Sequence, residues 1–292
     1  MSEGTWKPVA AMATMAVLFG VSFVATKVGL QGFTPTQLIF LRFTFAAGLF
    51  FGLRPWLRAG PVGWKGALQI LLMAVLEPGA YFFLEATGIQ RTLASTAAIL
   101  INTIPLFVLA LEALFLRVRV GARDLLLILC SLLGVCLLVL ASGLPKALGG
   151  SLLGDLLILA AAFSASVYTV IARRLLTKYS VLAVTRLQAL YAALLYLPFA
   201  GWDWWERGLK PVPGRSLGAM LFLGVGCSFL AYWLLNYSLA NARASHVAAF
   251  TNVIPVVGTA FAVLFLGEVL YPLQIVGGIL IIGCVALLNL RR

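Results

Sequence analysis

The sequence predicts an all-α, polytopic membrane protein of ten transmembrane helices, built as two inverted five-helix repeats. Three features support this prediction: the composition, the spacing of the apolar runs and an internal repeat. Of the 292 residues, 62% are hydrophobic and 10% are charged, whereas roughly 25% of the residues in a soluble domain are charged. Lipid is therefore the expected solvent for most of the chain.

The order of apolar runs and breaks predicts ten spans. Apolar runs recur from Val9 to Leu290, and the first, over residues 6–30, is too long for a signal peptide and lacks a convincing cleavage site. Nine breaks separate the predicted helices, at residues 31–35, 54–65, 90–93, 117–123, 142–152, 173–179, 201–215, 241–243 and 267–271. We expect one membrane domain, with the first repeat at residues 1–150 and the second at residues 151–292.

The distribution of basic residues predicts the orientation. The net charge is +12, but the basic residues lie at the ends of apolar runs, which argues against a nucleic-acid partner. With the N-terminus inside, the inner loops hold thirteen Lys and Arg residues and the outer loops hold five. The positive-inside rule then places both termini in the cytoplasm, and we expect a cell membrane such as the bacterial inner membrane. Lys27, Arg42 and Arg186 remain within the spans.

An internal repeat relates the two halves. Residues 94–116 and 244–266 align without a gap at a shift of 150 residues and are identical at ten of 23 positions. Because the copies lie five helices apart and five is odd, each copy crosses the bilayer in the opposite direction. Inverted repeats are a construction of many secondary transporters, whose substrate site lies at the repeat interface near the midplane.

Each copy of the repeat contains a proline in mid-span. Pro105 and Pro255 are predicted to kink helices four and nine, and each frees a backbone carbonyl. Because lipid offers no hydrogen bond, these carbonyls and the neighbouring Asn102 and Asn252 are expected to face protein or a water-filled cavity. A packing kink with each Asn bonded across helices is the alternative that the sequence leaves open.

Short motifs in a specific order run through the whole chain. They are Phe19-Gly20-Val21-Ser22-Phe23 followed by Lys27, Leu41-Arg42-Phe43, Gly154-Asp155, Tyr237-Ser238-Leu239, Ala244-Ser245, Ile254-Pro255 and Phe265-Leu266-Gly267-Glu268. By these motifs the chain resembles the EamA-like, ten-helix branch of the drug/metabolite transporter superfamily. The resemblance implies proton-linked or exchange-type export of small organic metabolites, often amino acids, through a cavity lined by both halves.

Three charged residues are predicted to share the outer third of the membrane. Counting about 1.5 Å per residue places Lys27, Arg42 and Glu85 there, on helices one, two and three. We expect Glu85 to pair with one of the two cations and to close the cavity from outside, as a gate. The structural alternative is a permanent pair that holds the helices together, or a Lys27 side chain that reaches the membrane–water interface.

Polar stripes on helices three and eight predict the substrate cavity. Glu77, Tyr81 and Glu85 follow an i, i+4, i+8 spacing on one helical face. Glu77 lies near mid-membrane, where a carboxyl group is a candidate proton carrier or partner for a substrate ammonium group, with a protonated packing residue as the alternative. Helix eight carries a comparable stripe, at Ser228, Tyr232 and Asn236. Tyr168, Trp233 and Tyr237 are candidate aromatic walls.

The expected function is secondary transport, with export of small organic metabolites such as amino acids by alternating access. A lipid or lipid-headgroup flippase of the same fold is the alternative. The sequence has no G-x-x-x-x-G-K-[ST] motif for a nucleotide-driven motor, and one histidine with four scattered cysteines makes an enzyme, a metal or a cofactor unexpected. The expected partners are the bilayer, a small-molecule substrate and protons as candidate coupling ions. The sequence leaves the substrate, the transport direction, the oligomeric state and the favoured conformation open.

Overall fold

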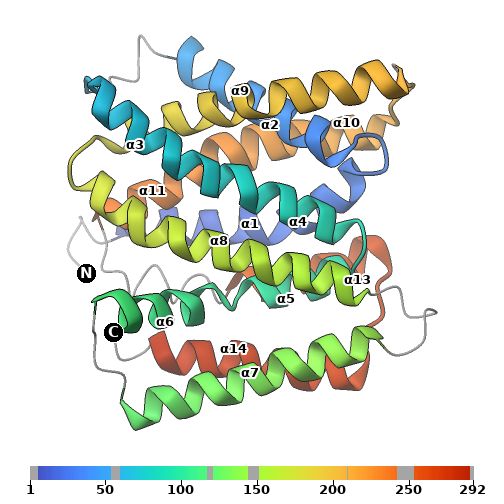
Figure 1. Ribbon diagram of the computed structural model, residues 1–292. Helices are drawn as coiled ribbons and strands as arrows, with labels where there is room; N and C mark the ends of the chain where they lie inside the picture. Colours follow the sequence, from blue (N-terminus) through green and yellow to red (C-terminus); the bar gives the residue numbers. More distant parts are fainter. Residues whose placement is uncertain are drawn as a thin grey trace.

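A computed structural model describes residues 6–53, 60–116, 121–143, 151–208, 210–241 and 253–289. Every regular element in these ranges is a helix (Figure 1). The first half contains α1 (Trp6–Gly29), α2 (Pro35–Gly52), α3 (Trp64–Ala74), η1 (Val75–Ala80), α4 (Tyr81–Ile89), α5 (Ala94–Ile101), α6 (Ile104–Leu116) and α7 (Ala122–Gly143). The second half contains α8 (Leu152–Leu176), α9 (Val181–Arg207), α10 (Gly214–Leu221), η3 (Phe222–Ala231), α11 (Tyr232–Asn241), α13 (Val253–Leu266) and α14 (Pro272–Asn289). The segments η1 and η3 are π-helical and join shorter helices into longer spans.

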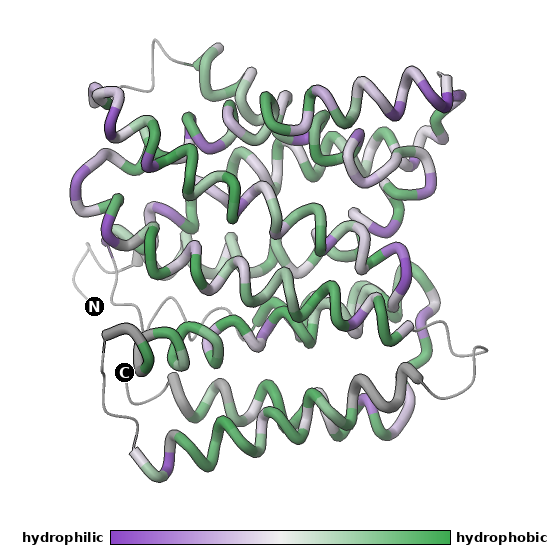
Figure 2. Tube along the Cα trace, viewed as in Figure 1, coloured by the Kyte–Doolittle hydropathy of each residue, from purple (hydrophilic) through white to green (hydrophobic). Residues whose placement is uncertain are grey.

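Seven helical stretches in the described residues are long and apolar enough to cross a membrane, and three shorter apolar helices accompany them. Hydrophilic residues gather toward the helix ends, whereas the middle stretches are mostly apolar (Figure 2). Large apolar side chains such as Leu72 and Leu264 are 62% and 75% exposed, and a soluble protein rarely leaves so many exposed together. The prediction of an all-α, multi-pass membrane protein is confirmed, and the count of ten spans stays a prediction.

The main helix contacts join the two halves. At one edge of the bundle α7 packs along α14, and at the opposite edge α2 packs along α9 (Figure 1). Between these edges, α1 contacts α13 and η3, and α4 contacts α8. Both halves therefore contribute to the buried interior of the bundle.

Two spans of the first half are interrupted near their middle. Glu77 has non-helical backbone angles (φ −144°, ψ 118°) and is followed by Pro78 inside η1, which the sequence interpretation did not single out. In the next span, α5 ends at Ile101 and α6 begins at Ile104, so Pro105 lies in the first turn of a new helix. A proline there has no N–H bond to lose, because the first turn lacks intrahelical partners.

The second copy of the repeat is described from Val253 onward. Pro255 is the third described residue of α13. Asn252, a predicted cavity residue, lies outside the described residues. Its counterpart Asn102 is buried at the end of α5, with 3% of its surface exposed.

Candidate functional site

The interruption at Glu77 frees backbone carbonyls that three side chains of the second half bind. Ser164 of α8 donates to the Leu76 carbonyl oxygen at 3.0 Å. Gln188 and Tyr196 of α9 donate to the carbonyl oxygens of Glu77 at 3.3 Å and of Gly79 at 2.8 Å. Because lipid cannot satisfy such groups, a broken helix at this depth requires protein partners. Hydrogen bonds at the break therefore connect the span formed by α3, η1 and α4 to the second half of the chain.

The Glu77 carboxylate is buried and bound by a tyrosine of the second half. The Tyr232 hydroxyl donates to Glu77 Oε1 at 2.5 Å, and both side chains are almost fully buried. Phe19, Phe43 and Phe82 surround the Tyr232 ring, with ring centroids 6.2 to 6.4 Å away. The Glu77–Tyr232 pair therefore lies in an apolar, aromatic environment shared by the two halves.

Four further polar side chains form a network beside this pair. Tyr168 donates to Asn236 Oδ1 at 3.2 Å and accepts from Gln188 at 3.2 Å. The Asn236 amide donates to Thr185 at 2.9 Å and to Gln188 Oε1 at 3.2 Å. Gln188 also reaches the Glu77 carbonyl oxygen, which connects the network to the helix break. We call the six residues the central polar cluster: Glu77, Tyr168, Thr185, Gln188, Tyr232 and Asn236.

The structure brings the two predicted stripes together. Glu77 of the first stripe accepts a hydrogen bond from Tyr232 of the second. Tyr168, a predicted aromatic wall, donates to Asn236 of the second stripe. Sequence interpretation missed the α9 residues Thr185 and Gln188, which connect these contacts. Their signal is a pair of polar residues at i, i+3 within an apolar run, a spacing that places both on one helical face.

Arg42 occupies a separate position at the interface of α2, α4 and η3. Its Nε donates to the Ser228 hydroxyl at 2.8 Å. Its guanidinium carbon lies 4.3 Å from the centroid of the Phe82 ring, close enough for a cation–π interaction. The approach of η3 to α2 depends on Gly224, where a Cβ atom would lie 3.0 Å from the Phe45 Cβ.

The expected ion pair of Glu85 with Lys27 or Arg42 does not form in this structure. In the described part of the chain, Glu85 accepts a hydrogen bond from Tyr81 at 2.9 Å and has no ion-pair partner within 4.0 Å. Lys27 instead donates to the carbonyl oxygens of Ile89, at 2.6 Å, and Thr92. Ile89 ends α4, and free carbonyls at a helix C-terminus attract cations.

Polar contacts between the halves lie close to Lys27, at the end of the bundle that the charge pattern predicts to be outside. Thr92 donates to Asp155 Oδ1 of α8 at 2.6 Å, and both residues are buried. The Glu268 carboxylate accepts from the backbone N–H of Ala94 at 2.8 Å and from the N–H and hydroxyl of Ser95 at 3.0 and 2.6 Å. We call the two sets of contacts between the halves, Thr92 with Asp155 and the start of α5 with Glu268, the outer contacts.

Glu268 acts as an N-terminal cap supplied by the opposite half. The first N–H groups of a helix have no intrahelical partner and attract a negative charge, and α5 begins at Ala94. Gly267 makes the approach possible, because its φ of 65° is a left-handed conformation that glycine adopts without strain. This contact gives the Phe265-Leu266-Gly267-Glu268 motif a physical role.

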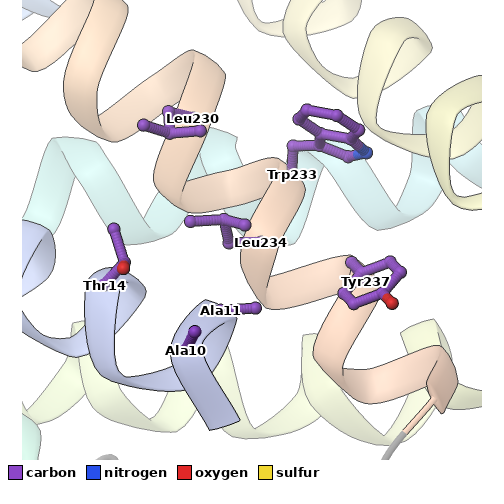
Figure 3. Close-up of a pocket in the computed structure, with 7 residues that line it drawn as sticks. All are labelled: Ala10, Ala11, Thr14, Leu230, Trp233, Leu234 and Tyr237. Atoms are coloured by element: carbon purple, nitrogen blue, oxygen red, sulfur yellow. The ribbon is translucent and has the colours of Figure 1, made fainter. Parts of the chain in front are cut away.

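A pocket of about 410 Å³ lies between α1 and the joined helices η3 and α11, near the N-terminal end of α1 (Figure 3). Its lining residues are Ala10, Ala11, Thr14, Leu230, Trp233, Leu234 and Tyr237. Trp233 therefore faces this pocket rather than the central polar cluster. It follows Tyr232 directly, and consecutive helical side chains point about 100° apart.

Comparison with known proteins gives a consistent result. The EamA-like transporter family matches residues 6–140 and again residues 152–290. An uncharacterized transporter of Archaeoglobus fulgidus is 30% identical over 96% of both chains. A probable amino-acid metabolite efflux pump of Salmonella typhimurium is 28% identical over 92% of this chain and 90% of its own. A crystal structure 19% identical in sequence shares the fold, with a TM-score of 0.67 over 98% of this chain and 99% of the other. The resemblance of the sequence motifs is confirmed, and the chain belongs to the EamA-like transporter family.

Proposed function

We propose that this chain is a secondary transporter that exports small polar metabolites, with amino acids as the leading substrate class, by alternating access of two inverted halves. The observation that carries the proposal is the central polar cluster. Charged and hydrogen-bonding groups are costly inside a membrane and usually serve a substrate or ion pathway. Here they come from both halves, as in transporters with a site at the repeat interface.

The two ends of the bundle differ in their contacts, which supports the proposal of alternating access. The outer contacts link Thr92 to Asp155 and Ser95 to Glu268, which joins the two halves at one end. The pocket of α1 and α11 lies toward the opposite end of α1. We infer that the outer contacts close the outer entrance in this conformation and must separate when the transporter opens outward.

A relative named as an amino-acid metabolite efflux pump supports the substrate class. The proposed cavity residues are Glu77, Tyr81, Glu85, Asn102, Tyr168, Tyr232, Asn236 and Asn252, with Trp233 at the pocket beside α1. Glu77 is the proposed proton carrier. In the proposed topology both termini are cytoplasmic.

The test is a flux assay in proteoliposomes with a panel of labelled amino acids, with and without an imposed pH gradient. We expect transport of at least one amino acid, driven by the gradient. Flux that ignores the gradient would exclude proton coupling through Glu77. If labelled lipid moves between leaflets and soluble amino acids do not compete, the flippase alternative replaces the amino-acid proposal.

A further inference from the structure

In the described part of the chain, the two terminal nitrogens of Arg42 have no hydrogen-bond partner. Only Nε forms a hydrogen bond in the described part of the chain, to Ser228, and 2% of the residue's surface is exposed. The side chain is thus nearly enclosed by protein, while its two terminal nitrogens remain available to a further hydrogen-bond acceptor. Such an arrangement in the interior of a transporter is expected to have a ligand as its missing partner.

The nearby carboxylates do not fill this role in the structure. Glu85 interacts electrostatically with Arg42, but its only described hydrogen bond comes from Tyr81. Glu77 is bound by Tyr232. Each carboxylate has a second oxygen, Oε2, that accepts no hydrogen bond from the described residues. One cation and two carboxylates thus lie in one interior region without neutralising each other through contact.

The surroundings of the Arg42 guanidinium fix its orientation. Ser228 binds the Nε edge, and Phe82 and Phe43 lie 4.3 and 5.5 Å from the guanidinium carbon. A guanidinium held in this way leaves its two terminal nitrogens available as a fork, and this fork matches the geometry of a carboxylate. Phe43 and Phe82 also pack against each other, with ring centroids 5.2 Å apart, so the guanidinium lies in an apolar environment.

Given the proposed export of amino acids, on which this inference rests, we propose that Arg42 binds the carboxylate of the substrate. Glu77 and Glu85 then face its ammonium group, and the rings of Phe43 and Phe82 contact its side chain. The ligand class is a zwitterionic α-amino acid with an apolar side chain. Arg42 is therefore assigned to substrate binding instead of to an external gate.

Three probes separate the charged groups of such a ligand. L-leucine carries both charges, leucinamide lacks the carboxylate, and 4-methylpentanoate lacks the ammonium group. Binding is measured by the thermal unfolding midpoint of the purified full chain in detergent, because a ligand that binds the folded state raises this midpoint. Transport of labelled leucine is measured separately in proteoliposomes.

We expect wild-type protein to bind leucine more tightly than either analogue. Arg42→Gln should raise the half-effective leucine concentration about tenfold or more, because charge-assisted hydrogen bonds are lost, and change that of leucinamide by less than about twofold. Arg42→Lys keeps the charge without the fork and should lie between these values. It also provides the same comparison if Arg42→Gln does not fold.

Arg186→Gln is the matched control. Arg186 is a second arginine within a span, half-buried, with its guanidinium carbon 5.2 Å from the Phe51 ring centroid. Its replacement should affect leucine and leucinamide equally. The subsite proposal is overturned if Arg42→Gln weakens both ligands by the same factor, leaves leucine binding unchanged, or if wild-type protein binds none of the probes.

The two readouts separate this inference from the proposed function. Leucine binding that depends on Arg42, without leucine transport, supports the subsite and contradicts the transport proposal for this substrate. Leucine transport with unchanged ligand selectivity in Arg42→Gln supports the function and overturns the subsite.

Discussion

At the scale of single residues, Glu77 has two roles, one of its backbone and one of its side chain. Its backbone breaks the helix and its carboxylate accepts the Tyr232 hydroxyl at 2.5 Å. A carboxyl group in the membrane interior is tolerated when hydrogen bonds or a proton compensate its charge. The pairing with Tyr232 of the second half places any change in Glu77 protonation at the interface of the halves.

Glu77→Gln tests this residue as the proton carrier. The amide oxygen can still accept from Tyr232, but the side chain no longer titrates. We expect the response of substrate flux to a pH gradient to disappear, while exchange of labelled for unlabelled substrate continues. Glu206→Gln, at an exposed carboxylate outside the proposed cavity, is the control and should keep the gradient response. A Glu77→Gln protein that still responds to the gradient would contradict the proposal.

At the scale of elements, side chains of other helices stabilise the interrupted span formed by α3, η1 and α4. Three carbonyl oxygens around Glu77 accept hydrogen bonds from α8 and α9. Pro78 and Gly79 in an apolar run indicate such a break in the sequence, since proline removes a helical hydrogen bond. Only the packed structure shows which side chains replace the lost bonds, because these come from residues about 90 to 120 positions away.

Tyr196→Phe should destabilise the protein through this break. The substitution leaves the Gly79 carbonyl oxygen buried without its 2.8 Å partner, which costs about 1–3 kcal/mol. We expect a lower thermal unfolding midpoint in detergent. Tyr191→Phe on the same helix removes a hydroxyl with no described hydrogen bond and should change the midpoint little. Equal effects of the two substitutions would argue against a structural role for the Tyr196 bond.

At the scale of the whole molecule, one carboxylate links two helices of opposite halves. Glu268 follows α13 and caps α5 through three hydrogen bonds. The Thr92–Asp155 bond joins α8 to the same region. In the proposed alternating access, these bonds must break when the halves separate at this end, so they are expected to favour the closed conformation.

Glu268→Ala should shift the population toward an outer-open conformation. Removal of the cap leaves the first N–H groups of α5 unpaired, which weakens the closed state by roughly 1–2 kcal/mol. Spin labels at Arg91→Cys and Lys210→Cys, in a background without native cysteines, are expected to report a larger fraction of long distances. Glu206→Ala, an exposed carboxylate in the same predicted outer region, is the control. An unchanged distance distribution would show that Glu268 does not hold the entrance closed.

The sequence by itself determined the all-helical membrane fold and the polar stripes at Glu77 and Tyr232, because hydrophobicity and helical spacing are local properties of the chain. Tertiary structure decided the partners. Lys27 binds helix-end carbonyls instead of Glu85, and Gln188 connects the helix break to Asn236. Helical periodicity states which face a residue occupies but not which helix lies opposite. Packing of the two halves decides that, because each buried polar group must find a partner within the protein.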